Sequence, residues 1–247
     1  MKAISKILLP AFLFIFISFS FISAQTSNST PKSVLVVYGG WEGHKPEEFK
    51  DLFVPWLKEQ GFEVVVSNSL DIYADKEKMK NFDLILQAIT MGTITKEQEK
   101  GLIEAVKNGA GLAGCHGGLG DSFRSNTSFL FMVGGQFAAH PGGKVKYQVN
   151  IEDHNDPITT GIKDHYVNSE QYYMLVDPGV KVLATTTFTG EHASWVDGVK
   201  MPVVWTKSFG KGKVFYSSIG HSMEDFEVYE VMEVMKRGFL WAMRDNK

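Results

Sequence analysis

Short apolar runs alternate with amphipathic stretches along the first half of the chain. Aliphatic and β-branched runs without polar alternation are typical of strands that are buried on both faces of a parallel sheet. They predict strands over residues 33–38, 62–66, 83–88 and 111–115. Helical patterns lie between these runs, so the order of elements predicts an α/β fold whose mainly parallel sheet has helices on both faces.

Two helices are predicted from apolar spacing and from the residues at their ends. The first begins at Pro46, a residue suited to the first turn of a helix. Its apolar stripe consists of Phe49, Leu52, Phe53, Trp56 and Leu57. Pro55 lies inside this stripe and predicts a kink or an early end. The second helix follows a capping box of Thr95 and Gln98 and ends at the Asn-Gly pair at residues 108–109.

The second half of the chain favours strands. They are predicted over residues 144–151 and 180–187, and residues 202–219 have the pattern of a hairpin around a Phe-Gly-Lys-Gly turn. A last helix is predicted from about Asp225, with an apolar side made of Val228, Met232, Met235 and Phe239. One domain over residues 32–247 accounts for the whole pattern.

The N-terminus has the pattern of a secretory signal peptide. Two lysines precede an apolar run over residues 7–22, and a Ser-Ala pair then offers a cleavage site before Gln25. We therefore predict a signal peptide over residues 1–24, a flexible lead-in over residues 25–31, and a secreted or periplasmic protein without a stable membrane anchor. The alternative is an uncleaved signal anchor, because the apolar run is long for a signal peptide.

Composition narrows the classes of partner. The chain is 44% hydrophobic and 21% charged, with a formal net charge of −3. These values are ordinary for a globular protein, and there is no basic excess of the kind that favours nucleic-acid binding. Cys115 is the single cysteine, which excludes an intrachain disulfide and a cysteine-rich metal cluster.

Three histidines directly follow predicted strands. His44 comes after the first strand, His116 after the fourth and His221 after the last. In an open parallel sheet, ligands bind beyond the carboxyl ends of the strands. If these three strands are parallel, the three imidazoles converge at one edge of the sheet.

A glycine-rich turn over residues 114–118 is the sharpest local feature. A strand that turns abruptly into a helix needs small residues around the turning residue, whose side chain is then exposed. Spacing alone leaves Cys115, a nucleophile, and His116, an acid–base group or metal ligand, as alternatives, beside a turn that serves packing only. The apolar strand favours an inward Cys115, which leaves His116 free to project.

Several long segments carry a resemblance to a known family. Residues 37–49, 111–124, 132–143, 169–176 and 202–221 resemble the trehalose-utilisation, or ThuA-like, family. The resemblance implies a three-layer α/β/α, flavodoxin-like fold of the class I glutamine-amidotransferase type. It also implies that His116 occupies the elbow and that His221 is the histidine after the last strand. Glu224 stands one residue too late for the His-x-Glu pattern of glutamine amidotransferases, so glutamine hydrolysis is not expected.

The same segments supply the rest of the candidate catalytic site. Pro141 restricts His140 to an extended backbone, and Glu170 lies beside aromatic residues that favour a partly desolvated acid. We predict that one concave pocket is surrounded by the catalytic residues His116, Glu170, His140 and His221. Three imidazoles also suit a zinc or manganese ion, for which the candidate ligands are His116, His140 and His221.

Four further residues are candidates for substrate binding: Trp41, His44, Arg124 and Tyr173. Aromatic rings pack on the C–H faces of sugars, although plain core packing is the alternative for the two aromatic residues. Arg124 has an alternative as well, which is an ion pair with Asp121. His154, His165 and His192 lie in polar loops and receive no role.

The resemblance implies two classes of function. In the first, the protein is an exported enzyme of carbohydrate catabolism. His116 and Glu170 would exchange protons with a disaccharide or keto-sugar, in a hydrolysis, elimination or isomerisation. In the second, it is an exported, non-catalytic carbohydrate-binding protein that uses the same pocket. Turnover of a keto-sugar separates the two classes, which the fold alone does not.

Overall fold

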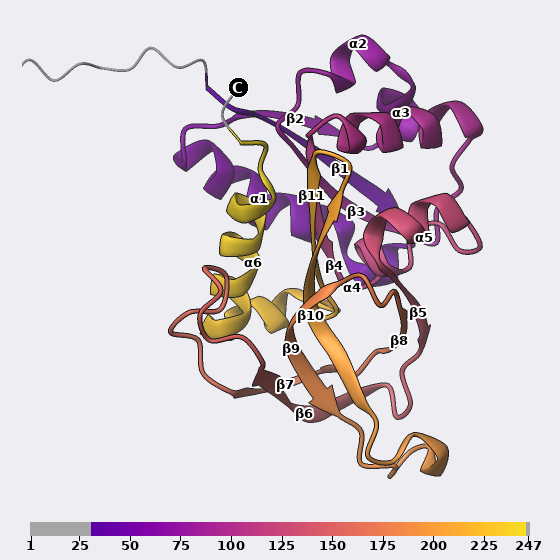
Figure 1. Cartoon of the computed structure of the whole chain (residues 1–247), viewed down its shortest axis with the longest axis vertical. Helices are drawn as coiled ribbons and strands as arrows, with labels where there is room; N and C mark the ends of the chain where they lie inside the picture. Colours follow the sequence, from indigo (N-terminus) through magenta and orange to yellow (C-terminus); the bar gives the residue numbers. More distant parts are fainter. Residues whose placement is uncertain (1–30, 246–247) are drawn as a thin grey trace, which may run out of the picture. The chain divides into compact units, whose positions relative to one another are not determined.

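Five parallel strands form one half of a nine-stranded sheet. The computed structural model describes residues 31–245. The parallel strands, in spatial order, are β2 (Glu63–Ser67), β1 (Ser33–Gly40), β3 (Leu84–Thr90), β4 (Gly111–Cys115) and β11 (Gly212–Ser217). The four strands predicted in the first half are confirmed, and the last strand is parallel to the first, as the sequence predicts (Figure 1).

The other half of the sheet is antiparallel. It continues from β11 through β10 (Lys200–Phe209), β9 (Lys181–Thr187), β6 (Lys144–Ile151) and β7 (His165–Glu170). The predicted hairpin is the β10–β11 pair. A separate two-stranded sheet pairs β5 (Gly135–Ala139) with β8 (Tyr173–Val176). The sequence pattern did not predict β5, β7 and β8, which are only five, six and four residues long.

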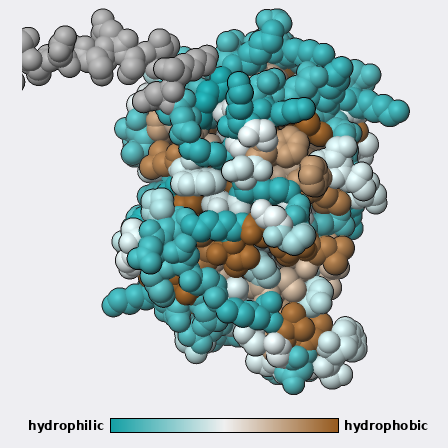
Figure 2. Space-filling view, viewed as in Figure 1, coloured by the Kyte–Doolittle hydropathy of each residue, from teal (hydrophilic) through white to brown (hydrophobic). Residues whose placement is uncertain are grey.

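Helices cover both faces of the sheet, which confirms the three-layer α/β/α fold. In β1, Val34 and Val36 pack in one core with α1 (Pro46–Glu59) and α6 (Tyr229–Ala242). The alternate residues Leu35 and Val37 point to the opposite face. There they pack with η2 (Leu70–Ala74), α2 (Lys76–Met79), α3 (Lys96–Lys107) and α5 (Thr127–Val133). The outer surface over α2 and α3 is mostly hydrophilic, as expected of amphipathic helices (Figure 2).

The helix ends agree with the sequence in most details. The capping box of Thr95 and Gln98 is formed at the start of α3. Helix α1 runs through Pro55 to Glu59, so the predicted early end at Pro55 is wrong. The buried face of α6 contains the predicted Met235 and Phe239 but is completed by Val231, Val234, Gly238 and Ala242. The predicted Val228 and Met232 lie at the margin of this face, partly buried against the same core.

The chain passes through short elements at the carboxyl edge of the parallel strands. These are η1 (Glu42–His44) after β1, α4 (His116–Gly120) after β4, and η4 (Met223–Glu227) after β11. A further short element, η3 (Ser194–Val196), lies between β9 and β10. Because β1, β4 and β11 are parallel, η1, α4 and η4 leave the sheet at the same edge, and this is the edge at which the candidate histidines were expected.

The predictions for the N-terminus lie outside the described residues. The signal peptide over residues 1–24 and nearly all of the lead-in fall before residue 31, where the description begins. Within residues 31–245, none of the helices has the length and apolar character needed to span a membrane. The described residues form one compact unit.

Candidate active site

His116 stands at a strained turn between β4 and α4. Its φ of +48° lies in the left-handed region, which costs a residue other than glycine about 1–2 kcal/mol. The turn is held in place by Tyr216, whose hydroxyl donates to the His116 carbonyl at 3.1 Å. Close backbone approach explains the flanking glycines, because a Cβ on Gly114 would lie 2.5 Å from the Gln87 carbonyl oxygen. Strain that is retained at such a position is a feature of functional sites.

Cys115 faces the opposite way. Its side chain is 5% exposed and belongs to the apolar core between the sheet and α1 and α6. Burial raises the pKa of the thiol well above its ordinary range. A buried thiol of raised pKa is a poor nucleophile. Of the two alternatives at the turn, the structure therefore presents His116.

A carboxylate lies at the centre of the histidines. Glu170 Oε2 lies 3.1 Å from His116 Nε2, 3.3 Å from His221 Nδ1 and 3.9 Å from His44 Nε2. The other oxygen, Oε1, lies 3.8 Å from His140 Nε2. All four residues predicted as catalytic are thus brought together, and His44, predicted as a substrate-binding residue, joins them. We name this group of five side chains the histidine cluster.

The residues of the cluster come from both halves of the sheet. His44 ends η1, His116 begins α4, and His221 follows β11, so three come from the ends of parallel strands. Glu170 ends the antiparallel strand β7, where it pairs in register with Lys144 of β6. His140 directly follows β5.

Backbone and side-chain oxygens orient the imidazoles from outside. The Ser218 carbonyl accepts a hydrogen bond from His116 Nδ1 at 2.8 Å. Thr90 Oγ1 lies 3.0 Å from His44 Nδ1. The other nitrogen of each ring faces Glu170. The contacts with Ser218 and Thr90 therefore fix the tautomer of His116 and the orientation of the His44 ring. Thr90 ends the parallel strand β3, so its position at this edge of the sheet follows from strand direction, as it does for the histidines.

Asp225 holds the loop that carries His221. Its side chain is 3% exposed, and Oδ2 accepts hydrogen bonds from the backbone N–H groups of Gly220 at 3.2 Å and His221 at 2.8 Å. The Ser169 hydroxyl also donates to this oxygen, at 2.7 Å. Asp225 therefore ties the His221 loop to the strand that ends at Glu170. The sequence pattern only placed Asp225 at the start of a helix.

Burial and neighbouring charges set the protonation of the cluster. Burial, together with the nearby His116, lowers the pKa of His44 to about 3, so this imidazole is neutral. Burial also lowers the pKa of His116. For Glu170, burial acts to raise the pKa, but the contacts with His116 and His221 outweigh it and hold the pKa well below its usual range. The same contact with Glu170 raises the pKa of His221.

An aromatic wall lines one side of the cluster. The Tyr172 ring stacks on His116, with centroids 3.9 Å apart. Phe137 lies 4.4 Å from the Tyr172 ring and 5.6 Å from the His140 ring. Tyr173, the predicted tyrosine, instead packs against Phe188 at 5.8 Å. Residues 171–172 lie between β7 and β8, so the tyrosine that contacts the cluster is not identified by strand alternation, and substrate binding by Tyr173 stays a prediction.

The two other predicted substrate-binding residues lie at the margin of the cluster. Trp41 is 48% exposed and meets the His44 ring edge-on at 4.7 Å. Arg124 forms a bidentate ion pair with Asp121, with both N–O distances at 2.6 Å. The ion-pair alternative for Arg124 is therefore observed, although its guanidinium also lies 5.9 Å from the Phe137 ring centroid.

The residues that could hold a metal ion differ in part from the predicted candidates. One ligand atom each from His44, His116, Glu170 and His221 lies within 4.8 Å of all the others. His140 is not in this set, because only its distance to Oε1 of Glu170 is short. This group shares His116 and His221 with the predicted candidates and adds His44 and Glu170. Metal binding by His140 stays a prediction.

Comparison with known proteins assigns the chain to a family. The profile of the ThuA family, described as trehalose utilisation, matches residues 33–242. The chain belongs to the ThuA family. This match confirms the resemblance seen in the sequence. No curated protein sequence matches the chain.

Solved structures of ThuA-like proteins have the same fold. A ThuA-like protein from Bacteroides uniformis is 19% identical, with a TM-score of 0.75 over 89% of this chain and 94% of its own. One from Parabacteroides merdae is 18% identical, with a TM-score of 0.67 over 88% and 93%. A cytoplasmic protein from Salmonella typhimurium is 13% identical, with a TM-score of 0.60 over 86% and 100%. These likenesses support the flavodoxin-like architecture of this ThuA protein.

Proposed function

We propose that this ThuA protein is an enzyme of carbohydrate catabolism that acts on a disaccharide or keto-sugar by His/Glu acid–base chemistry. The observation that carries the proposal is the Glu170 carboxylate, 13% exposed and within 4 Å of four imidazoles. A partly desolvated carboxylate beside imidazoles is suited to moving a proton to or from a substrate. Membership in a trehalose-utilisation family supports a sugar as the substrate.

The exposure of each group suggests its role. His140 is the most exposed imidazole of the cluster, at 40%, and lies on the Oε1 side of Glu170. We assign proton exchange with the substrate to Glu170 and His140. His116 is 1% exposed, so it acts by fixing the position of Glu170 and not by direct contact with the substrate. His221 contacts the same carboxylate and assists in orienting it.

Apolar surface near the cluster suits a sugar ring. Trp41 lies against His44 with about half of its surface exposed, and Phe137 stacks near His140. The C–H faces of a pyranose pack well on such rings. The reacting carbon of a sugar held there would lie near Glu170 and His140, where a proton beside a carbonyl group is removed in an isomerisation or elimination.

Thiol chemistry has little support. Cys115 is buried in the core, and Glu224, the nearest acid to His221 in the sequence pattern, pairs with Lys144 at 2.7 Å instead. A glutamine amidotransferase needs an exposed thiol beside a histidine. We therefore propose a sugar hydrolase, lyase or isomerase.

Export of the enzyme is a separate part of the proposal. The sequence over residues 1–24 supports a cleavable signal peptide and a secreted or periplasmic location. Intact-mass measurement of exported material is expected to give a chain that begins at or near Gln25. A chain that retains Met1 would contradict cleavage.

A substrate screen tests the proposed activity. The purified protein is incubated with oxidised and unoxidised disaccharides, and the products are followed by NMR. Turnover of at least one sugar by the wild type, with loss in the His140→Ala variant, is the expected result. Saturable sugar binding without turnover would instead favour a non-catalytic carbohydrate-binding protein.

A further inference from the structure

Four ligand atoms in the histidine cluster lie close enough together to surround one metal ion. The ligand atoms of His44, His116, Glu170 and His221 all lie within 4.8 Å of one another. The two shortest contacts with Glu170 Oε2 are 3.1 and 3.3 Å. Metal bonds of about 2.1 Å place neighbouring ligand atoms about 3.0 Å apart in an octahedron and about 3.4 Å apart in a tetrahedron. These two contacts fall in this range, whereas His44 Nε2 lies 3.9 Å from Glu170 Oε2 and has to move closer to bind the same ion.

The three imidazoles approach this point from different directions. Their ring planes cross at 69° for His44 and His116, 79° for His44 and His221, and 73° for His116 and His221. Rings that stacked on one another would turn their nitrogens away from a shared centre. Near-perpendicular rings are compatible with one nitrogen of each facing Glu170 Oε2, at 3.9 Å for His44, 3.1 Å for His116 and 3.3 Å for His221.

The hydrogen bond to Ser218 determines which His116 nitrogen carries hydrogen. A carbonyl oxygen only accepts, so Nδ1 is the N–H donor in this 2.8 Å bond. In the neutral ring, Nε2 then presents a lone pair to Glu170 Oε2, 3.1 Å away. A lone pair facing a carboxylate oxygen is repulsive unless a proton or a cation lies between them. Histidines that bind metals typically donate their outer N–H in this way.

His221 supplies an independent observation. Its Nδ1 atom is buried, and among the described residues no atom completes a hydrogen bond to it with acceptable geometry. Glu170 Oε2 lies 3.3 Å away, close enough for charge interaction. A buried ring nitrogen without a hydrogen-bond partner is unfavourable. It becomes satisfied when the nitrogen binds an ion.

We propose that this ThuA protein binds one divalent transition-metal ion through His44 Nε2, His116 Nε2, His221 Nδ1 and Glu170 Oε2. Imidazole and carboxylate ligands suit Zn²⁺ and Mn²⁺, and the Irving–Williams order gives Zn²⁺ the higher affinity. The geometry alone supports binding of the ion. One consequence rests on the proposed function: the ion would polarise the carbonyl oxygen of a keto-sugar, while Glu170 Oε1 and His140 remain free for proton transfer.

Metal binding is measured directly, without reference to activity. The chain is prepared without a histidine tag and treated with a chelator. Zn²⁺, Mn²⁺ or Co²⁺ is then added, and bound metal is determined by elemental analysis and, for Co²⁺, by visible absorption. We expect one ion per chain. His44→Ala and the nearly isosteric Glu170→Gln variant are expected to weaken binding by about 100-fold, and Thr90→Val, which removes the contact with His44 Nδ1, by about 10-fold.

Two matched histidine variants serve as controls. His140→Ala is expected to retain the ion and lose turnover, which separates the metal site from the proton-transfer role. His165→Ala, whose ring bonds to the Lys163 carbonyl, is expected to bind the ion as the wild type does. Circular dichroism checks that each variant is folded. Wild-type binding below about one ion per ten chains, or binding unchanged in both His44→Ala and Glu170→Gln, would overturn the proposal. Metal binding without turnover of any sugar would leave it standing and refute the proposed function.

Discussion

His116 Nε2 and Glu170 Oε2 lie 3.1 Å apart, although β4 and β7 are separated by four other strands in the sheet. Five steps between neighbouring strands span about 24 Å in a flat sheet. The sheet must therefore curl. The reason lies in β6, whose residues Asn150 and Ile151 pair with β9 while residues 144–149 pair with β7. Once it leaves β9, β6 carries β7 and Glu170 back toward the parallel strands.

Replacement of His116 and of Cys115 is expected to have opposite effects. His116→Ala removes the group that holds Glu170, so turnover is expected to fall by about 100-fold or more with the fold retained. Cys115→Ala removes a buried contact and is expected to lower the free energy of unfolding by about 1–2 kcal/mol while activity stays near the wild-type rate. Turnover and denaturant unfolding of both variants check this. Rapid thiol labelling of the native protein, with an inactive Cys115→Ala variant, would reverse the assignment.

The aromatic ring of Tyr172, not its hydroxyl, is expected to support turnover. The ring stacks on His116 with the centroids 3.9 Å apart, and this contact does not involve the hydroxyl. Tyr172→Phe is therefore expected to keep turnover within about 3-fold of the wild type. Tyr172→Ala removes the stacking surface and is expected to reduce turnover at least about 10-fold, through a less well-oriented imidazole. Equal losses in the two variants would point to the hydroxyl instead.

Gly117 leaves room for the ring of His44. A Cβ at this position would lie 2.4 Å from His44 Nδ1 and 2.5 Å from its Cε1 atom. Gly117→Ala is therefore expected to displace the imidazole and reduce turnover, with little loss of helical content. Gly179→Ala, in an exposed turn outside the site, is the control. If Gly117→Ala retains full activity, His44 has no part in the site.

Local sequence patterns predicted most of the fold but only part of the candidate site. The parallel strands, the hairpin and the elbow at His116 each follow from local patterns of apolar residues and glycines. Convergence of His44, His116 and His221 follows from strand direction. Glu170 was found by resemblance alone, because its position depends on the curl of the antiparallel half. That curl results from strand pairing between residues distant in sequence. The local periodicity of hydrophobic residues does not predict such pairing.

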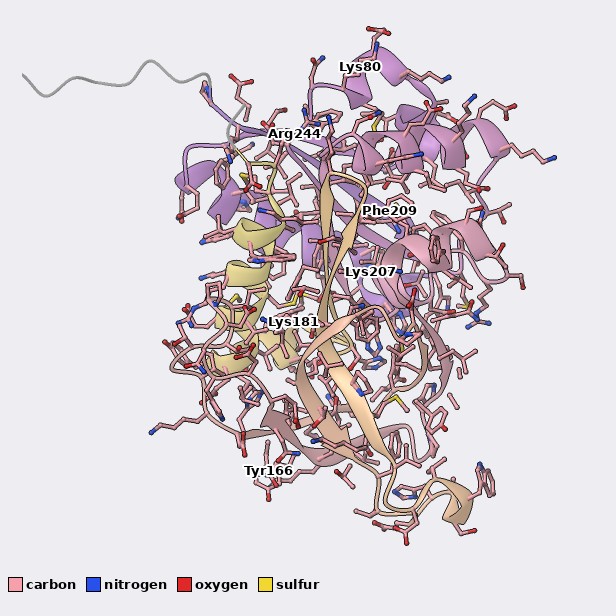
Figure 3. The ribbon with its side chains drawn as sticks, viewed as in Figure 1. Lys80, Tyr166, Lys181, Lys207, Phe209 and Arg244 are labelled. Carbon is pink, nitrogen blue, oxygen red and sulfur yellow. The ribbon has the colours of Figure 1, made fainter. Side chains whose placement is uncertain are left out.

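One ion pair makes stability depend on pH. Lys207 of β10, labelled in Figure 3, donates to Asp177 at 2.5 Å and also to the Phe131 carbonyl of α5. The bond from Lys207, together with the Gly179 N–H, holds the pKa of Asp177 below its ordinary value. A carboxyl with a lowered folded-state pKa stabilises the fold above its unfolded pKa of about 3.9 and loses this contribution as the pH falls further.

The Asp177→Asn variant measures this contribution. Between pH 7 and pH 3, the wild-type free energy of unfolding is expected to fall by up to about 1 kcal/mol more than that of the variant. Urea unfolding at several pH values gives both curves. Parallel curves for the two proteins would show that the pair contributes nothing measurable.

Hydrogen exchange at the substrate carbon tests the central claim most directly. A keto-disaccharide is incubated with the protein in D₂O, and NMR follows both cleavage and the loss of the proton on the carbon beside the carbonyl group. We expect the wild type to exchange or eliminate that proton at least about 100-fold faster than Glu170→Gln, because the amide cannot accept it. If the wild type produces neither exchange nor cleavage, or if Glu170→Gln matches its rate, the cluster is not a proton-transfer site.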